Sequence, residues 1–362
     1  MTNSVDGFFT RVRELAAPDG AGAASPAQRA RWAQLWDQAA EVSCSAFEER
    51  DPDALLAAHQ ALAWLYDQHF LTPDQGPVGG QFHPGAVGVQ QILEDGWERA
   101  ERARAPWDAR DVPTEPTRFA RWLEEVVGGH AVCGHPLFDF LAEQAGRRQV
   151  LHFLKLDGPL NVRFYEVLLM AMVGARGPMR QEMVRNLVDE TGDGDEARGH
   201  ANLCRAGLEA FRLSYDPLAT TVVHGWQGLA GYNHVVGMAL HRRHHFRMIG
   251  TLAVTEAMDP PNYTKLLAGC TRVGLAVPAA GPAGIAERQW DGPLAFYAVH
   301  IVQEADHAAG WTTNVVLPRL TDHPDAAHEI ALGAIGRLNT AADYYDHLLT
   351  DFTAPIAAGT PQ

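Results

Sequence analysis

The chain has 362 residues, of which 46% are hydrophobic and 20% are charged. This composition is that of a globular protein with a sizeable core, and it excludes global disorder, which needs low hydrophobicity and dense charge. Asp and Glu number 44 against 29 Lys and Arg, so the formal charge is −15. Since no basic run is longer than the Arg242–Arg243 step, we expect neither a nucleic acid nor an anionic membrane as a partner.

The cysteines and the apolar runs indicate the compartment. The four cysteines lie far apart and form no C-x-x-C pair, so neither a disulfide framework nor a zinc ribbon is indicated. The N-terminus lacks the basic and apolar regions of a secretory signal. The apolar run Val167–Val173 is far shorter than the roughly 20 residues of a membrane span. We therefore expect a soluble, cytoplasmic protein.

The N-terminal third is predicted to be helical. Its amphipathic segments carry apolar side chains at spacings of three and four residues, and they are residues 27–49, 53–67 and 117–127. Proline and glycine collect in residues 72–90, which predicts a loop. We place the domain boundary after residue 125. Residues 1–125 are expected to form a helical arm for dimerisation or as a lid, and residues 126–362 the main domain.

The main domain is predicted to be a run of helices. The segments with helical periodicity are residues 136–155, 158–175, 178–191, 195–211, 225–258, 260–273, 287–316 and 325–350. Prolines stand near their starts and glycines near their ends, as is common in helices. Strand alternation is nearly absent, so the expected fold class is all-α.

The sharpest local motif is H-I-V-Q-E-A-D-H at residues 300–307. At about 100° per residue, His300, Glu304 and His307 lie within about 60° of one another on one face of a helix. Their apolar neighbours indicate partial burial, and a buried stripe of this kind needs partners because an unpaired buried charge is costly. The alternative is a solvated polar face that carries histidines by chance.

Further acids stand at helical segments. Glu190 ends an amphipathic segment and His200 follows ten residues later, while Glu256 is a single carboxylate in an apolar segment and Asp157 precedes Gly-Pro. Each also has a plain structural explanation: an acidic turn, a surface residue or a helix N-cap. Together they form a set of carboxylates and imidazoles without a thiolate, which helical bundles use to bind two metal ions. Such a set suits iron or manganese better than structural zinc.

The order and spacing of these segments resemble those of the haem-oxygenase-like diiron oxidases and oxygenases, also described as iron-containing redox enzymes. The resembling segments are F-L-K-L-D-G-P at 153–159, R-N-L-V-D-E-T-G-D-G-D-E-A-R-G-H at 185–200, T-E-A-M-D-P at 255–260 and H-I-V-Q-E-A-D-H at 300–307. The resemblance implies a haem-oxygenase-like helical bundle over residues 125–350. It implies metal ligands at Asp157, Glu190, His200, Glu256, His300, Glu304 and His307, and all but Asp157 are also expected to be catalytic.

Two positions depart from the family pattern. The first-helix ligand is usually Glu, whereas Asp157 stands here, with Glu166 as the alternative. The acid of the last helix is often Asp, whereas Glu304 stands here. Glu190 is our choice for the carboxylate that bridges the two metal ions. His245, eleven residues before Glu256, is expected on the same helical face, lining the substrate cavity.

The resemblance implies two Fe(II) ions per chain and O2 as co-substrate. We expect an N-oxygenase that acts on an amine or amino-acid-like small molecule in specialised metabolism, with an external electron donor and a homodimeric assembly. One alternative is a desaturase or C–C bond-cleaving oxidase acting on an amino or fatty acid. The others are a non-catalytic metal-binding bundle and a metal-free member of the same fold.

Overall fold

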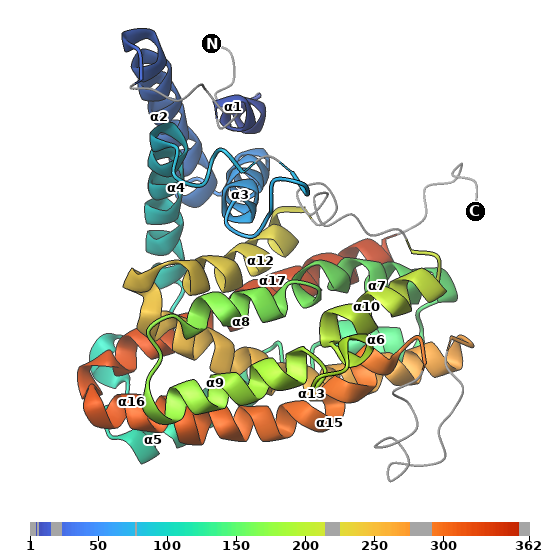
Figure 1. Cartoon of the computed structure of the whole chain (residues 1–362). Coiled ribbons are helices and arrows are strands. Elements are labelled where there is room, and N and C mark those ends of the chain that lie inside the picture. Colours follow the sequence, from blue (N-terminus) through green and yellow to red (C-terminus); the bar gives the residue numbers. More distant parts are fainter. Residues whose placement is uncertain are drawn as a thin grey trace. The chain divides into compact units, whose positions relative to one another are not determined.

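The structure, a computed structural model, describes residues 5, 7–15, 24–76, 78–213, 225–275 and 292–354, without the side chains of Leu15, Glu304 and Ala305. Every regular element in these ranges is helical (Figure 1), which confirms the all-α fold class. Among the described residues, we find no helix with the length and hydropathy needed to span a bilayer. The chain divides into two compact units, Met1–Pro106 with Leu218–Leu240, and Trp107–Pro217 with His241–Gln362.

The first unit is a small helical bundle. Its helices are α1 (Phe8–Leu15), α2 (Pro26–Phe47), α3 (Pro52–Asp67), α4 (Pro84–Ala103) and α12 (Gly225–Leu240). Helices α2 and α3 begin as their sequences indicate, with a proline in the first turn and with Ser25 and Asp51 accepting hydrogen bonds from first-turn amides.

Helix α4 corrects the predicted loop over residues 72–90, of which only the part before Pro84 is irregular. Gly85 is among the residues that predict a loop, but it lies inside the helix, as Gly88 does. A Cβ atom at Gly85 would lie 2.9 Å from the Trp32 ring, and one at Gly88 would lie 2.2 Å from the Trp36 ring. These glycines therefore allow α4 to approach α2 closely.

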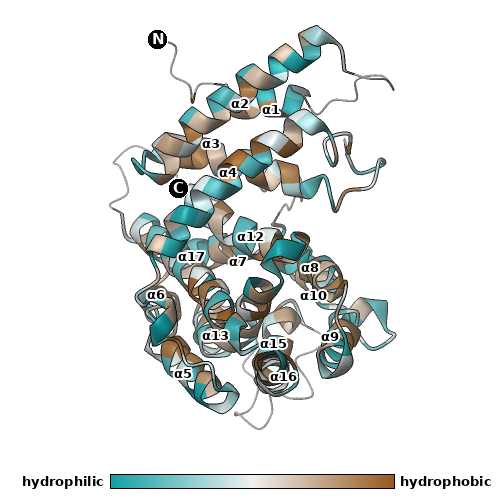
Figure 2. Ribbon diagram, turned by 90° about the vertical axis from the view of Figure 1, so that its left-hand side faces the viewer, coloured by the Kyte–Doolittle hydropathy of each residue, from teal (hydrophilic) through white to brown (hydrophobic). Residues whose placement is uncertain are grey.

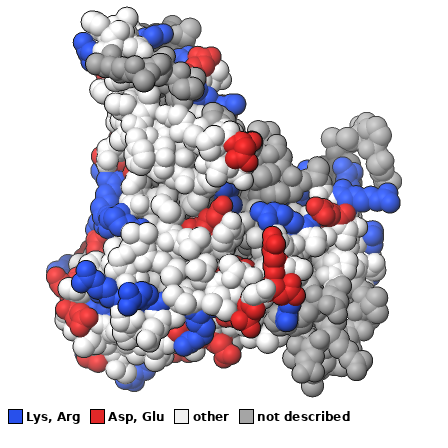
Figure 3. Space-filling model, in the orientation of Figure 1, with Lys and Arg blue, Asp and Glu red and all other residues white. Residues whose placement is uncertain are grey.

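The second unit contains the remaining helices. They are α5 (Pro116–Gly129), α6 (Pro136–Glu143), α7 (Arg147–Asn161), α8 (Phe164–Met172), α9 (Gly177–Glu190), α10 (His200–Ala210), α13 (His245–Arg272), α15 (Ala295–Gly310), α16 (Leu317–Asp322) and α17 (Ala327–Thr353). Helix α13 packs against α15, α17 and α6 and lies inside this unit, as the view along the helices in Figure 2 shows. On the face in Figure 3, acidic and basic side chains are interspersed.

Helices α13 and α17 touch backbone to backbone. A Cβ atom at Gly250 would lie 1.8 Å from the carbonyl oxygen of Ile330, and one at Gly333 would lie 1.9 Å from that of Arg247. Because no larger residue fits at either position, these two glycines fix where α13 crosses its neighbour.

The structure corrects three predicted helix boundaries. The segment 225–258 is interrupted by an extended His241 and a short 3-10 turn at Arg242–His244, and Arg242 donates hydrogen bonds to the carbonyls of Met170 and Val173 at the end of α8. Pro260 and Pro261 do not end a helix but lie inside α13. Likewise, α7 continues through Pro159, so Asp157 lies inside a helix and is not an N-cap.

The predicted domain boundary differs from the division into compact units. Residue 125 lies within α5, a helix of the second unit, whereas the chain divides at Pro106 and the first unit also takes in α12. The dimerisation or lid role of the N-terminal residues stays a prediction.

Candidate metal centre

A cavity lies among α7–α10, α13 and α15 of the second unit. Its lining consists of Asn161, Phe164, Glu190, His200, Thr255, Glu256, Asp259, Tyr263, Phe296, His300, Gln303 and His307. Five of the seven predicted ligands are therefore brought together here. The space open to the centres of water molecules is about 30 Å³, whereas one water needs at least about 10–15 Å³. The cavity has room for small ions or a few waters.

Glu190, His200 and His300 form the tightest group of ligand atoms. One such atom from each residue lies within 4.8 Å of the other two. His200 Nδ1 lies 3.1 Å from Glu190 Oε1, and His200 Nε2 lies 3.0 Å from Gln303 Oε1. Burial alone would lower the pKa of His200, but the charge and hydrogen bond of Glu190 outweigh it and raise that pKa. This pairing brings the end of α9 and the start of α10 against α15.

A tight turn explains the ten-residue spacing between Glu190 and His200. Gly192, Asp193 and Gly194 all have positive φ angles, of 82°, 51° and 87°. A Cβ atom at Gly192 would lie 2.2 Å from the carbonyl oxygen of Asp195, so only glycine fits there. The acidic segment that could have been a simple solvated turn therefore folds so that the two ligands meet.

His300 is oriented in the manner of a metal ligand. Its Nδ1 lies 2.7 Å from the carbonyl oxygen of Phe296 and donates to it, so Nε2 carries the lone pair that can bind a metal. Burial, reinforced by the charge of His200, holds the pKa of His300 well below its usual value. The imidazole is therefore neutral, which is the form that coordinates metals.

His307 and Glu256 form a second group. His307 Nδ1 lies 3.2 Å from Glu256 Oε2, and His307 Nε2 lies 2.9 Å from Asp189 Oδ2. Burial alone would lower the pKa of His307, but Glu256 and Asp189 together raise it to about 9. Burial also raises the pKa of Glu256. Glu256 and Asp189 stabilise the proton on His307, and a metal cation would compete with this proton for the same carboxylates.

Residues 151–342 match the family model of iron-containing redox enzymes. The chain belongs to this family. The match includes every residue that lines the cavity, and it confirms the family resemblance and an iron-dependent oxidoreductase. No curated protein matches the chain.

The lining fits the iron that this family contains. Its potential ligands are carboxylates and imidazoles, which suit iron, and neither a thiol nor a Lys or Arg side chain is among the twelve lining residues. Glu190, Glu256 and Asp259 are all buried there. Because carboxylates without a cation repel one another in a low-dielectric site, the cavity favours a positive ion.

Asp157 does not line the cavity. Its carboxylate accepts a hydrogen bond from Asn161 Nδ2 at 2.9 Å, lies 3.4 Å from the Tyr263 hydroxyl and is also bonded by Tyr297. Burial raises its pKa to about 6, against the opposing effect of these donors. Asp157 as a metal ligand stays a prediction.

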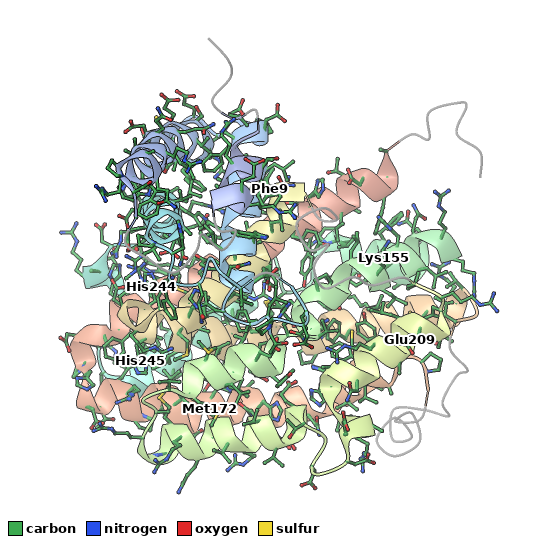
Figure 4. All side chains as sticks on the ribbon, turned by 45° about the horizontal axis from the view of Figure 1, so that its top comes forward. Phe9, Lys155, Met172, Glu209, His244 and His245 are labelled. Atoms are coloured by element: carbon green, nitrogen blue, oxygen red, sulfur yellow. The ribbon has the colours of Figure 1, made fainter. Side chains whose placement is uncertain are left out.

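The other first-helix choice and the acid of the last helix also stay predictions. Glu166 lies on α8 outside the cavity lining, and Arg163 Nη1 is 3.1 Å from its carboxylate. Glu304 is part of α15, but its side chain lies outside the described residues. His245 does not line the cavity, which contradicts its expected place there. It begins α13 (Figure 4), about three helical turns before Glu256.

Several residues of the centre were not predicted. Asp189 pairs with His307 across two helices, and Gln303 pairs with His200. Neither contact has a sequence signal, because both depend on how α9 and α10 pack against α15. Asp259 is different: it follows Glu256 by three residues, a spacing that places both acids on one helical face. That spacing is a signal that could have identified it.

Proposed function

We propose that this iron-containing redox enzyme is a non-haem diiron oxygenase that uses O2 to oxygenate the nitrogen of an amine or amino-acid-like substrate in specialised metabolism. The observation that carries the proposal is the pair of ligand groups in one buried cavity. Glu190, His200 and His300 form one group, and Glu256 and His307 form the other. Two such groups are what two Fe(II) ions require.

Glu190 is the residue proposed to bridge the two ions. It belongs to the first group by distance, and its charge also raises the pKa of Glu256 in the second group. A carboxylate has two oxygens and can therefore serve two cations at once. The family resemblance also implies Glu304 and Asp157 as ligands.

The residues around the ligands prepare the site for O2 chemistry. Bound iron would supply the electrons and the Lewis acidity with which O2 is activated. Phe164, Tyr263 and Phe296 form the aromatic part of the wall. Gln303 holds His200, and the Phe296 carbonyl holds His300. These contacts fix ring orientation before a metal or substrate binds.

A neighbouring apolar cavity favours a second candidate function, desaturation or C–C cleavage on a hydrocarbon chain. The residues that line it are Leu154, Leu203, Cys204, Gly207, Leu208, Phe211, Pro293, Leu294, Phe296 and Tyr297. Phe296 belongs to both cavities and its ring centroid lies 4.1 Å from that of His300. An alkyl group in this second cavity would therefore lie beside the metal ligands. The proposed enzyme receives electrons from an external donor and forms a homodimer.

Anaerobic titration with Fe(II), followed by O2 uptake with a panel of amines, amino acids and fatty acids, tests the proposal. We expect two equivalents of iron per chain and a product that has gained one oxygen on nitrogen. Loss of two hydrogens or of a carbon fragment would instead identify the second candidate. His300→Ala and His307→Ala should lose iron, whereas His347→Ala should not, because His347 pairs with Asp351 on α17. If both cavity variants retain iron, the site is wrong.

A further inference from the structure

Asp259 is a buried acid of the cavity to which the family resemblance assigns no role. Its side chain is 9% exposed and it lines the cavity beside Glu256 and His307. It lies on α13 three residues after Glu256, and side chains at this spacing have Cβ atoms about 5–6 Å apart on one face. Helical bundles place pairs of metal ligands at this same spacing.

The carboxylate of Asp259 has no hydrogen-bond donor among the described residues. It forms no hydrogen bond or ion pair at contact distance with any residue that the structure describes. Arg337 acts on it only as a more distant charge, because the Arg337 guanidinium is bound through Nε to Thr255 Oγ1 at 3.1 Å. Buried polar groups are nearly always bonded, so a buried carboxylate without a donor calls for an explanation.

Asp157 provides the contrast. Both acids lie in the same part of the unit, since the charge of Asp157 contributes to the raised pKa of Asp259. Asp157 is already satisfied by Asn161, Tyr263 and Tyr297 and stands outside the cavity lining, whereas Asp259 faces the cavity without a donor. Hydrogen bonds within the protein therefore stabilise the carboxylate of Asp157, whereas the carboxylate of Asp259 needs a ligand in the cavity.

The size and charge of the cavity identify the class of ligand. About 30 Å³ is open to water-molecule centres, which is sufficient for metal ions and a few waters. Three carboxylates line the cavity. Glu190 belongs to the first group and Glu256 to the second, so Asp259 is the acid of the lining that neither group includes.

We propose, on the basis of the proposed diiron function, that Asp259 is a metal ligand that completes the site of Glu256 and His307, and that Asp157 is not a ligand. Asp157 then acts as a buried acid that orients Tyr263 and Asn161 at the cavity wall. On this assignment α13 contributes two carboxylates to the metal centre.

Anaerobic titration with Fe(II), and separately with Mn(II), tests this assignment in the full-length protein. In Asp259→Asn we expect the second equivalent of metal to bind at least about tenfold more weakly, with the first equivalent retained. In Asp157→Asn we expect both equivalents to bind with less than about a threefold change. Asp322→Asn, at the exposed end of α16, is the matched control and should bind as the wild type does.

Thermal unfolding of the metal-free variants at pH 8 separates a ligand from a structural acid. Asp259→Asn should be at least as stable as the parent without metal and should gain less stability from Mn(II), because it removes an unpaired buried charge. A loss of metal-free stability with unchanged metal binding would overturn the proposal. So would loss of the second equivalent in Asp157→Asn alone. If the wild type itself binds no second equivalent, the diiron function fails instead, and the ligand assignment falls with it.

Discussion

The two units bury polar side chains in opposite ways. In the first unit, Glu94 accepts hydrogen bonds from the Tyr66 hydroxyl and the Gln90 amide, both at 2.9 Å, and Asp67 accepts one from Tyr232 at 2.7 Å. Both acids accept hydrogen bonds from neutral donors of their own unit. In the second unit, the cavity acids face imidazoles, other acids or no donor at all.

The buried histidines show the same difference. His59 of the first unit lies among the rings of Phe47, Trp97 and Trp226, with centroids 5.7, 4.9 and 6.4 Å away, and burial lowers its pKa to about 3. His307 of the second unit lies between two carboxylates and its pKa is raised to about 9. The buried polar groups of the first unit thus stabilise the fold, whereas those of the cavity in the second unit form a site that suits a cation.

The largest expected effect comes from removing one acid in each unit. Glu190→Ala should weaken iron binding more than about 100-fold while changing the free energy of unfolding of the metal-free protein by at most about 1 kcal/mol, since it also relieves repulsion with Glu256. Glu94→Ala should cost about 2–3 kcal/mol, because two buried donors lose their acceptor, and should leave iron affinity unchanged. Urea unfolding and metal titration measure both. Similar stability losses in the two variants would remove the contrast.

A smaller effect is expected from His59 in acid. The pKa of a histidine in the unfolded chain is about 6.5, whereas that of His59 in the folded protein is about 3. Between these two pH values, His59 is therefore protonated in the unfolded chain and neutral in the folded protein. The contribution of His59 to the free energy of unfolding is therefore complete above about pH 6.5 and is lost as the pH falls, by roughly 2 kcal/mol at pH 5. Urea unfolding followed by tryptophan fluorescence at pH 7 and pH 5 measures it. His59→Gln should reduce this loss, and an unchanged loss would contradict the assignment.

His307 should respond with the opposite sign in the metal-free protein. Because its folded pKa of about 9 exceeds the unfolded value, its contribution is complete below about pH 6.5 and is lost as the pH rises through 9. His307→Gln should remove this alkaline loss when unfolding is compared at pH 7 and pH 9.5. An unaltered alkaline loss would show that Glu256 and Asp189 do not hold the proton on His307.

The smallest effect concerns the contact that supports Glu190. Trp311 Nε1 donates to Asn186 Oδ1 at 2.6 Å, one turn of α9 before Glu190. Trp311→Phe keeps the ring packing but leaves this buried oxygen without its donor, at a cost of about 1–2 kcal/mol. We expect a threefold to tenfold weaker iron affinity as α9 loosens against the π-helical segment Trp311–Val316 that follows α15. Val315→Ala, nearby and apolar, should cost stability without a change in iron affinity.

The sequence could predict those site residues whose spacing within one helix or one short segment places them together, but not those brought together by contacts between helices. The stripe of His300 and His307 follows from helical geometry alone, and the Glu190–His200 spacing was carried by the family resemblance. Asp189 and Gln303 could not be found, since their partners lie across helix contacts. The glycines of α4 were misinterpreted because close packing and turns use the same residue.

Pro260 and Pro261 weaken the backbone hydrogen bonding of one turn of α13. Neither residue has an N–H, so neither can donate the usual helical bond to the carbonyl of Glu256 or Ala257. The turn that carries Glu256 and Asp259 therefore lacks two backbone hydrogen bonds and is more compliant than a fully bonded turn, in a helix that is in close contact with α17 at Gly250. A compliant turn can adjust the reach of two acids as the charge between them changes, without moving the scaffold around it.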